Sequence, residues 1–208
     1  MTRRITTQAD VAQGAAWLAA AEPRFAAALA RTGPLPLRLA PDGFGALLNK
    51  IVSQQVSVAS AQAIWGRVQA AGLDHPGAVL AAHDDDLRAV GLSRPKVKYA
   101  RALAEADIDY AALRDAPDAE VIAILTAVPG IGVWTAQVYA MFNLGRADVF
   151  APADLALQET VRILWDLEAR PSAKALEHMA QAWTPWRAVA ARLLFTYYRV
   201  HKHREGII

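Results

Sequence analysis

Apolar side chains recur three and four positions apart along most of the chain, with polar side chains between them, a spacing typical of amphipathic α-helices. Strand-like alternation of apolar and polar residues is hard to find, and segments rich in Ala and Leu occur from end to end. The sequence therefore predicts an all-α fold. The expected helices cover residues 8–21, 24–31, 43–52, 56–71, 85–90, 94–105, 119–127, 133–144, 155–167, 173–183 and 186–201.

Capping and breaking residues stand at the ends of these predicted helices. Short polar side chains that can accept a hydrogen bond from free helix-start amides are found at Asp42, Ser93, Asp118, Asp154 and Ser172. Gly33 and Gly72 stand where helices can stop.

The clearest linker is the segment 33–41, Gly-Pro-Leu-Pro-Leu-Arg-Leu-Ala-Pro, because prolines are excluded from helix interiors and extend the residues before them. We expect this linker to join two helical lobes. One lobe would combine residues 1–32 with the C-terminal helices, and the other would span about residues 42–150.

Composition narrows the class of protein. The 208 residues are 54% hydrophobic, which is ample for a packed core, and the formal net charge is only +2. Acidic residues gather at 84–86 and 105–120, so the small net charge is compatible with a basic face elsewhere on the surface. The basic residues form two clusters, Arg94, Lys96, Lys98 and Arg101, and Arg199, His201, Lys202, His203 and Arg204. Either cluster taken alone is equally well explained as an ordinary solvated surface.

Several kinds of chemistry are absent from the sequence. The chain has no cysteine, which excludes disulfides, thiolate-bound zinc and a cysteine-ligated iron–sulfur cluster. The five histidines show no metal-ligand spacing. The N-terminus lacks the apolar core of a signal peptide, and no apolar run reaches the ~20 residues of a membrane span. We therefore expect a soluble cytoplasmic protein that does not bind membranes, and nothing in the sequence requires a dimer.

The most informative segment is residues 125–136, Leu-Thr-Ala-Val-Pro-Gly-Ile-Gly-Val-Trp-Thr-Ala, in which a Pro-Gly-Ile-Gly turn separates two apolar helices. The last carbonyls of the first helix and the first amides of the second converge on this turn. Such a turn can hold a cation on carbonyls and a phosphate on amides, and the glycines allow a close approach. Contacts of this kind bind nucleic acid without reading its sequence. The alternative is a plain corner between helices.

Four segments in order resemble one family. They are Ile51-Val52-Ser53-Gln54-Gln55-Val56-Ser57-Val58-Ala59, the hairpin itself, residues 148–157 (Asp-Val-Phe-Ala-Pro-Ala-Asp-Leu-Ala-Leu), and Trp183-Thr184-Pro185-Trp186-Arg187. Together they resemble the helix-hairpin-helix superfamily of DNA base-excision glycosylases, and most closely its DNA-3-methyladenine glycosylase II branch. The resemblance implies a two-lobe fold with the active-site cleft between the lobes, and duplex DNA with alkylated bases as the partner.

The resemblance makes Asp154 the catalytic carboxylate. Breaking an N-glycosidic bond builds positive charge on the sugar, which a fixed anion stabilises, and an alkylated purine is already cationic and departs without a general acid. The sequence leaves open whether Asp154 also orients the attacking water. The alternative role, an N-cap alone, is compatible with catalysis.

Trp134 stands where bifunctional relatives carry a lysine that attacks the sugar. We therefore expect a monofunctional enzyme without strand-nicking activity. The indole would offer a π face to a flipped-out cationic base, with a core tryptophan as the alternative. Val138, one turn later, lines the base pocket by resemblance and stands where relatives often carry an aromatic residue. By the same resemblance Phe195 completes the pocket, with a place in the core as its alternative.

The resemblance also implies the DNA contacts. Gln55 would wedge into the duplex and fill the gap left by the flipped nucleotide, with a capping or interlobe hydrogen bond as its alternative role. Burying Gln54 and Gln55 without partners would cost about 1–3 kcal/mol each, so we expect an exposed helix junction. The remaining implied contacts to DNA are Ser53, Gly130, Gly132 and Thr135, and the carbonyls implied to hold a sodium or potassium ion are those of Thr126, Val128 and Gly130.

The prediction is therefore a glycosylase that excises alkylated purines of the 3-methyladenine type and requires no cofactor. Two alternatives remain: a glycosylase for other damaged or mismatched bases, and a non-catalytic helix-hairpin-helix module. Trp183 and Trp186 are expected to be structural. An N-terminal α/β domain that some relatives carry is not expected in a chain of this length.

Overall fold

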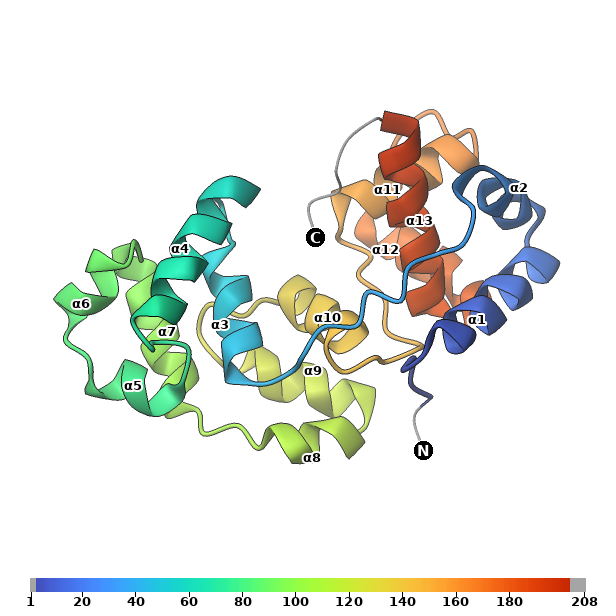
Figure 1. The fold of residues 1–208 in the computed structure, drawn as a ribbon. Coiled ribbons are helices and arrows are strands. Elements are labelled where there is room, and N and C mark those ends of the chain that lie inside the picture. The colour runs from blue at the N-terminus through green and yellow to red at the C-terminus, as the bar shows by residue number, and fades with distance from the viewer. Residues whose placement is uncertain (1–2, 203–208) are drawn as a thin grey trace. The chain divides into compact units, whose positions relative to one another are not determined.

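The computed structural model describes residues 3–202. Within that range every named element is a helix, and the single bridge between extended segments, Arg4 with Arg146, is isolated. The predicted all-α fold is confirmed. The helices (Figure 1) are α1 (Gln8–Ala21), α2 (Pro23–Thr32), α3 (Phe44–Val52), α4 (Val58–Ala70), α5 (Pro76–Ala81), α6 (Asp84–Ala89), α7 (Arg94–Glu105), α8 (Tyr110–Asp115), α9 (Asp118–Thr126), α10 (Val133–Phe142), α11 (Leu155–Leu164), α12 (Ala173–Ala180), the 3-10 turn η1 (Gln181–Trp183) and α13 (Arg187–Lys202).

The chain forms two compact units. Unit 1 comprises Met1–Ala40 and Ala140–Ile208, and unit 2 comprises Pro41–Tyr139. The chain passes from one to the other at the end of the proline-rich segment and again within α10. In the described part of the chain, no helix is both long and apolar enough to cross a membrane.

Unit 1 is built around α13, which packs against α1, α2 and α11 (Figure 1). The hydroxyl of Thr160 on α11 donates to the carbonyl of Leu194 on α13 at 3.2 Å and so ties these two helices together. Trp183 lies buried in an aromatic cluster that includes Phe25 and Phe150, with ring centroids 5.2 and 5.5 Å away. Trp186 is also buried, so the structural role predicted for both tryptophans is confirmed.

A buried arginine organises the middle of unit 1. The guanidinium of Arg192 donates to the carbonyl oxygens of Leu37, Ala188 and Met141 at 2.9, 2.9 and 3.3 Å. Burial, followed by the nearby charge of Arg38, lowers the pKa of Arg192 to about 10. Arg192 thus holds the proline-rich segment and the end of α10 against α13, so this segment is fixed rather than loose.

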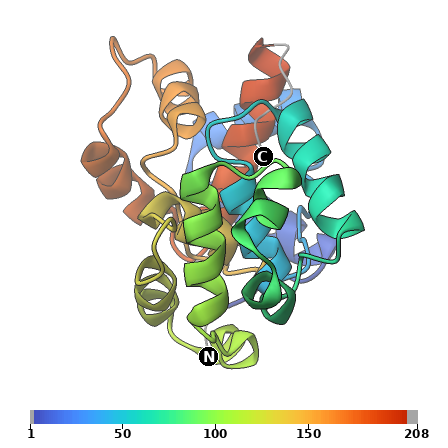
Figure 2. The same cartoon turned by 90° about the vertical axis from the view of Figure 1, so that its left-hand side faces the viewer.

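Unit 2 is arranged around α7, the upright green helix at the centre of that unit in Figure 2, which packs against α3, α5 and α6. Val97, Ala100 and Leu103, spaced three residues apart, form an apolar face of α7, and this face is buried. The ammonium of Lys96 donates to the carbonyl of Val52 at 2.7 Å and satisfies the C-terminal end of α3.

The structure corrects two of the predicted helix caps. Gly43, not Asp42, is the N-cap of α3, because the Asp42 carboxylate forms a bidentate ion pair with Arg114 at 2.8 and 2.9 Å. Pro117 is the N-cap of α9, and Asp118 is the first residue of the helix. Ser93, Asp154 and Ser172 stand at the N-cap positions as predicted. The side chains of Asp154 and Ser172 accept helix-start amides, whereas the Ser93 side chain makes no capping hydrogen bond.

Some helix boundaries also differ from the prediction. The short helices α5 and α8 were not expected, and the helix expected to begin at residue 56 begins at Val58 because the Ser57 hydroxyl caps it. The helices expected to end at 144 and 167 end at Phe142 and Leu164, and the one expected over 173–183 ends at Ala180 and continues as the turn η1.

Candidate functional site

The hairpin between α9 and α10 lies in unit 2. Its turn is closed by the amide of Val128, which donates to Leu125 at 3.2 Å, and by the amide of Ile131, which donates to Val128 at 3.1 Å. The side chains of Val128 and Ile131 are buried beneath the turn, whereas Pro129 and Gly132 are exposed. The turn is therefore anchored by its apolar side chains, and its glycine edge faces outward.

The two glycines of the hairpin have different reasons to be glycine. Gly130 has a φ of 91°, and a Cβ at this position would come within 2.7 Å of the Cβ of Tyr99 on α7. The fold itself requires glycine here. A Cβ on Gly132 would meet nothing within 4 Å, so the isolated chain has room for a side chain at that position.

Gly132 begins the second helix of the hairpin. Its carbonyl accepts the amide of Ala136 at 3.0 Å, so the helix starts at Val133, whose amide has no acceptor within the helix. Gly132 has no side chain to cap that amide, and both residues are exposed. An exposed amide edge without a covering Cβ suits the close approach of an anion.

Gln54 fastens the junction between α3 and α4 to the hairpin, because its side-chain amide donates to the Gly130 carbonyl at 2.9 Å. Gln55 is exposed and has a φ of 58°, the left-handed conformation that costs a residue with a Cβ roughly 1–2 kcal/mol. The expected exposure is confirmed for Gln55 only, because Gln54 is partly buried with the Gly130 carbonyl as its partner. The two glutamines differ in role: Gln54 positions the hairpin, and Gln55 projects from the junction.

Neither serine beside this junction has a free hydroxyl. The hydroxyl of Ser53 donates back to the Asn49 carbonyl at 2.8 Å, and that of Ser57 accepts the amide of Ser60 as the cap of α4. Ser53 is exposed, so a phosphate can still reach its hydroxyl oxygen.

Trp134 is 39% exposed at the start of α10, so the interpretation as a core tryptophan is wrong. Thr135 and Val138 are buried. Tyr139 is buried too, and its hydroxyl accepts the amide of Gly43 at 2.8 Å; burial is the main cause that raises the pKa of this tyrosine. Tyr139 therefore positions α10 against the start of α3 and offers no ring to a ligand.

Asp154 lies in unit 1 as the N-cap of α11. Its Oδ1 accepts the amides of Ala156 and Leu157 at 2.8 and 3.2 Å, and the residue is 9% exposed. The loop before it is held by the side-chain amide of Gln158, which donates to Pro152 at 2.9 Å. The carboxylate is thus fixed in orientation at the positive end of a helix dipole.

Phe195 belongs to the same unit on α13 and is only 4% exposed. Its ring lies 6.2 Å from that of Phe142, with the guanidinium of Arg38 6.0 Å from its centroid. Arg38 has a left-handed φ of 47°, and burial lowers its pKa. The surroundings of Phe195 are therefore aromatic and cationic.

Of the three carbonyls expected to hold a monovalent ion, two accept hydrogen bonds within the protein. Gly130 already accepts from Gln54, and Val128 accepts from Ile131 at 3.1 Å. Each oxygen keeps a second lone pair. Across residues 3–202 there is no cluster of three or more His, Asp or Glu side chains suited to a metal ion.

Exposed apolar side chains border the positions predicted to act, and the sequence pattern alone did not single them out. They are Val56 and Val58 beside Gln55, Val133 beside Trp134, and Leu155 beside Asp154. The sequence feature that could have identified Val58, Val133 and Leu155 is their position as the first residue of a helix.

Lys50 on α3 is a further ionisable group near the junction, four residues before Gln54. Burial lowers the pKa of Lys50 to about 8. A lysine with such a pKa is partly deprotonated near neutral pH and is more reactive than a surface lysine.

The arrangement resembles known proteins at the level of sequence and fold. Residues 48–186, which include Gln54, the hairpin and Asp154, match the HhH-GPD superfamily of base excision DNA repair proteins. The crystal structure of a DNA-3-methyladenine glycosidase from Bacillus halodurans is 32% identical, with a TM-score of 0.79 over 89% of this chain and 88% of that one. The 3-methyladenine DNA glycosylase Mag1 of Schizosaccharomyces pombe, solved in complex with abasic DNA, has a TM-score of 0.77 at 23% identity, over 91% of this chain and 97% of that one.

A curated relative, the Bacillus subtilis protein YfjP, is 28% identical over 77% of this chain, and the match covers 60% of YfjP. Since the family match covers more than half of the sequence, the chain belongs to the HhH-GPD superfamily of base excision DNA repair proteins.

Proposed function

We propose that this protein is a monofunctional DNA glycosylase that excises alkylated purines of the 3-methyladenine type from duplex DNA. The observation that carries the proposal is the Asp154 carboxylate, held by the amides of Ala156 and Leu157 at the start of α11. The substrate class is supported by the similarity to the Bacillus halodurans protein, which is named a DNA-3-methyladenine glycosidase.

In the proposed reaction the bond between C1′ of the sugar and the base nitrogen breaks, and its electron pair leaves with the base. Since the alkylated purine carries a positive charge, this electron pair neutralises it, and the positive charge moves to the sugar. A carboxylate of fixed orientation stabilises that charge without reorganising. Water then adds to C1′ and releases a proton, which leaves an intact abasic site.

The remaining site residues have supporting roles in the proposal. The amides of Gly132 and Val133 bind a backbone phosphate, and the exposed indole of Trp134 stacks on the flipped-out base. Gln55 fills the gap in the duplex, which is consistent with its exposed position and left-handed backbone. The monovalent ion at the carbonyls of Thr126, Val128 and Gly130 remains part of the proposal.

Trp134 also supports the absence of lyase activity, because an indole forms no Schiff base with the sugar. No residue of the hairpin segment 125–136 is a lysine.

The proposal is tested by incubating the protein with DNA treated with a methylating agent and separating the released bases by chromatography. We expect release of 3-methyladenine together with abasic sites in unbroken strands. Binding to the duplex without release of any base would instead identify a passive phosphate clamp. Release of oxidised or mismatched bases, with no release of alkylated purines, would contradict the proposed substrate class.

A further inference from the structure

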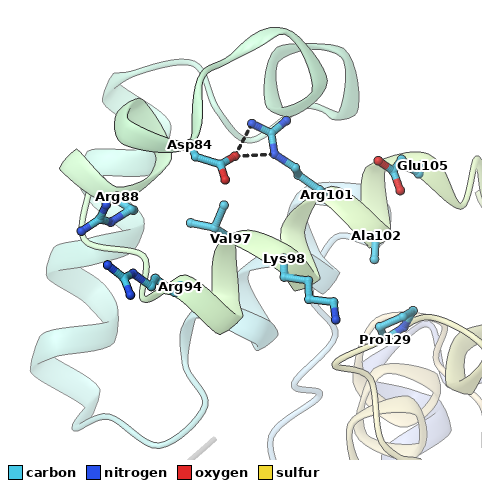
Figure 3. A pocket seen from close by; sticks show the side chains of 9 residues that line it. All are labelled: Asp84, Arg88, Arg94, Val97, Lys98, Arg101, Ala102, Glu105 and Pro129. Atoms are coloured by element: carbon cyan, nitrogen blue, oxygen red, sulfur yellow. Dashed lines mark hydrogen bonds and ion pairs between the residues drawn. The ribbon is translucent and has the colours of Figure 1, made fainter.

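A hollow of about 650 Å³ lies in unit 2 between α6, α7 and the hairpin turn. Figure 3 shows the side chains that line it, with Lys98 directed toward Pro129 of the hairpin and Arg94 at the opposite end beside Arg88. The lining contains four cations and two carboxylates: Arg88, Arg94, Lys98, Arg101, Asp84 and Glu105. The hollow is therefore positively charged and opens beside the residues proposed to bind DNA.

The cations of this hollow are not equivalent. Arg101 has a structural role, because its guanidinium binds the Asp84 carboxylate at 2.7 Å and the carbonyls of Val79 and Ala82 at 3.1 and 2.8 Å. Arg88 is 3.4 Å from Asp85 in an exposed pair, and such pairs contribute little.

Arg94 and Lys98 remain available for an external partner. Both side chains are exposed, and within residues 3–202 neither side chain is in a hydrogen bond or an ion pair with another group of the protein. They stand four residues apart on α7, so both lie on the same face of the helix. Arg94 is also the first residue of α7, where the helix dipole adds to its positive potential.

The position of the hollow relative to the hairpin is fixed by packing. Tyr99, the neighbour of Lys98 on α7, lies against Gly130 so closely that a Cβ on the glycine would clash with it. Gln54 also holds the same glycine, through the bond at 2.9 Å to its carbonyl. The hollow is therefore fixed in position relative to the hairpin. A DNA strand bound to the hairpin amides would place its flanking phosphates beside this hollow.

We propose that this hollow is a second binding site for the DNA backbone, in which Arg94 and Lys98 bind phosphates that flank the one held at Gly132. The inference rests on the proposed function for the position of the DNA. Its occupant is a phosphodiester backbone because six of the nine lining residues are charged, the cations outnumber the carboxylates by four to two, and Pro129 makes the hollow continuous with the hairpin. Such contacts add affinity and orientation without sequence preference.

The test compares the double variant Arg94→Gln/Lys98→Gln with the wild type on a duplex that contains a single abasic-site analogue. Affinity is measured as a function of salt concentration. Two lost phosphate contacts should make the slope of log K against log salt about 1.8 less steep. Ethylation of individual phosphates should interfere with wild-type binding at positions beyond the hairpin contact, and this interference should disappear in the double variant.

Two control variants set the meaning of the result. Arg170→Gln/Lys174→Gln removes the same charge from exposed positions of unit 1 and should leave the slope and the interference pattern unchanged. Glu105→Gln removes an exposed carboxylate from the hollow and should tighten binding.

An unchanged slope and an unchanged interference pattern in Arg94→Gln/Lys98→Gln would overturn the inference, and so would an equal loss in the unit 1 control. Either result leaves the proposed function intact, provided that the wild type still releases alkylated bases. A wild type that forms no complex with the abasic duplex and releases no base would instead remove the proposed function, and the inference with it.

Discussion

The side-chain amide of Gln54 donates a hydrogen bond to the carbonyl of Gly130 at 2.9 Å, across 76 positions of sequence. This bond joins the junction between α3 and α4 to the turn of the hairpin. Since Tyr99 packs against the same glycine, two contacts hold the turn. The hairpin is therefore a fixed element of unit 2, and its exposed edge is available to a ligand without rearrangement.

Replacing Gln54 by Ala should loosen the hairpin. We expect a loss of about 1 kcal/mol in the free energy of unfolding, because the Gly130 carbonyl loses its partner. DNA affinity should fall as well, since the glycine edge is no longer held in place. Denaturant unfolding and fluorescence anisotropy measure the two effects. Gln55→Ala is the matched control and should leave stability nearly unchanged, because the Gln55 side chain is exposed. Equal loss of stability in both variants would show that the Gln54 bond is not what holds the turn.

Substitution of the two hairpin glycines should have different effects, on folding stability at Gly130 and on DNA binding at Gly132. Gly130→Ala should lower the free energy of unfolding by more than 1 kcal/mol, roughly, because it combines a positive φ with a clash against Tyr99. Gly132→Ala should fold normally, because its Cβ enters open space, yet bind duplex DNA more weakly. Thermal melting and a binding titration on each variant are the measurements. Full DNA affinity in Gly132→Ala would contradict the proposed phosphate contact.

Lys50 should make stability depend on pH above neutrality. Its pKa in the folded chain is about 8, against 10.5 for an ordinary lysine. Between these values the unfolded chain binds more protons, so stability rises with pH; the burial penalty is complete below pH 8 and vanishes above pH 10.5. Compared with Lys50→Gln, the wild type should gain on the order of 1–2 kcal/mol across this range, after allowance for partial exposure. Unfolding titrations at several pH values give the difference. A constant difference between the two proteins would contradict the lowered pKa.

Borohydride treatment during turnover should trap no covalent complex between the protein and DNA. The expected reason is that Trp134 replaces the lysine that forms a Schiff base in bifunctional relatives. Lys50→Gln belongs in the same experiment, because Lys50 is an amine whose pKa is already lowered to about 8. Trapping in the wild type that vanishes in Lys50→Gln would identify an unexpected nucleophile and contradict the monofunctional proposal.

The sequence predicted the bounds of the long helices well. It did not predict contacts between residues far apart in the chain. The bounds of α1 and α7 were predicted to the residue, because both helices are long. The sequence also placed Ser93 at the N-cap position of α7. The helices α5 and α8, six residues each, are too short for periodicity to identify. Asp42 had the composition of a cap, but its carboxylate is taken by Arg114, 72 residues away, and no local pattern indicates that pair.

The same limit applies to the candidate site. The proposed chemistry depends on the hairpin and Asp154, and both stand at helix starts as expected. The separate roles of Gln54 and Gln55 depend on a contact to Gly130 that adjacent, identical residues cannot reveal. The different roles of the basic residues in 94–101 are likewise visible only in the structure. Lys96 and Arg101 bind protein groups, whereas Arg94 and Lys98 line the hollow. Of the second basic cluster, His203 and Arg204 lie outside the described residues.

The catalytic role of Asp154 is tested most directly by Asp154→Asn under single-turnover conditions, on a duplex with one alkylated purine. Asparagine is as good an N-cap as aspartate, so it can still accept the amides of Ala156 and Leu157, and the unfolding midpoint should stay unchanged. Affinity for a duplex with an abasic-site analogue should also remain within a small factor of the wild type. The rate of base release should fall by about 100-fold or more, because the anion that stabilises the sugar is lost. Base release at the wild-type rate by a stable Asp154→Asn variant would contradict the account.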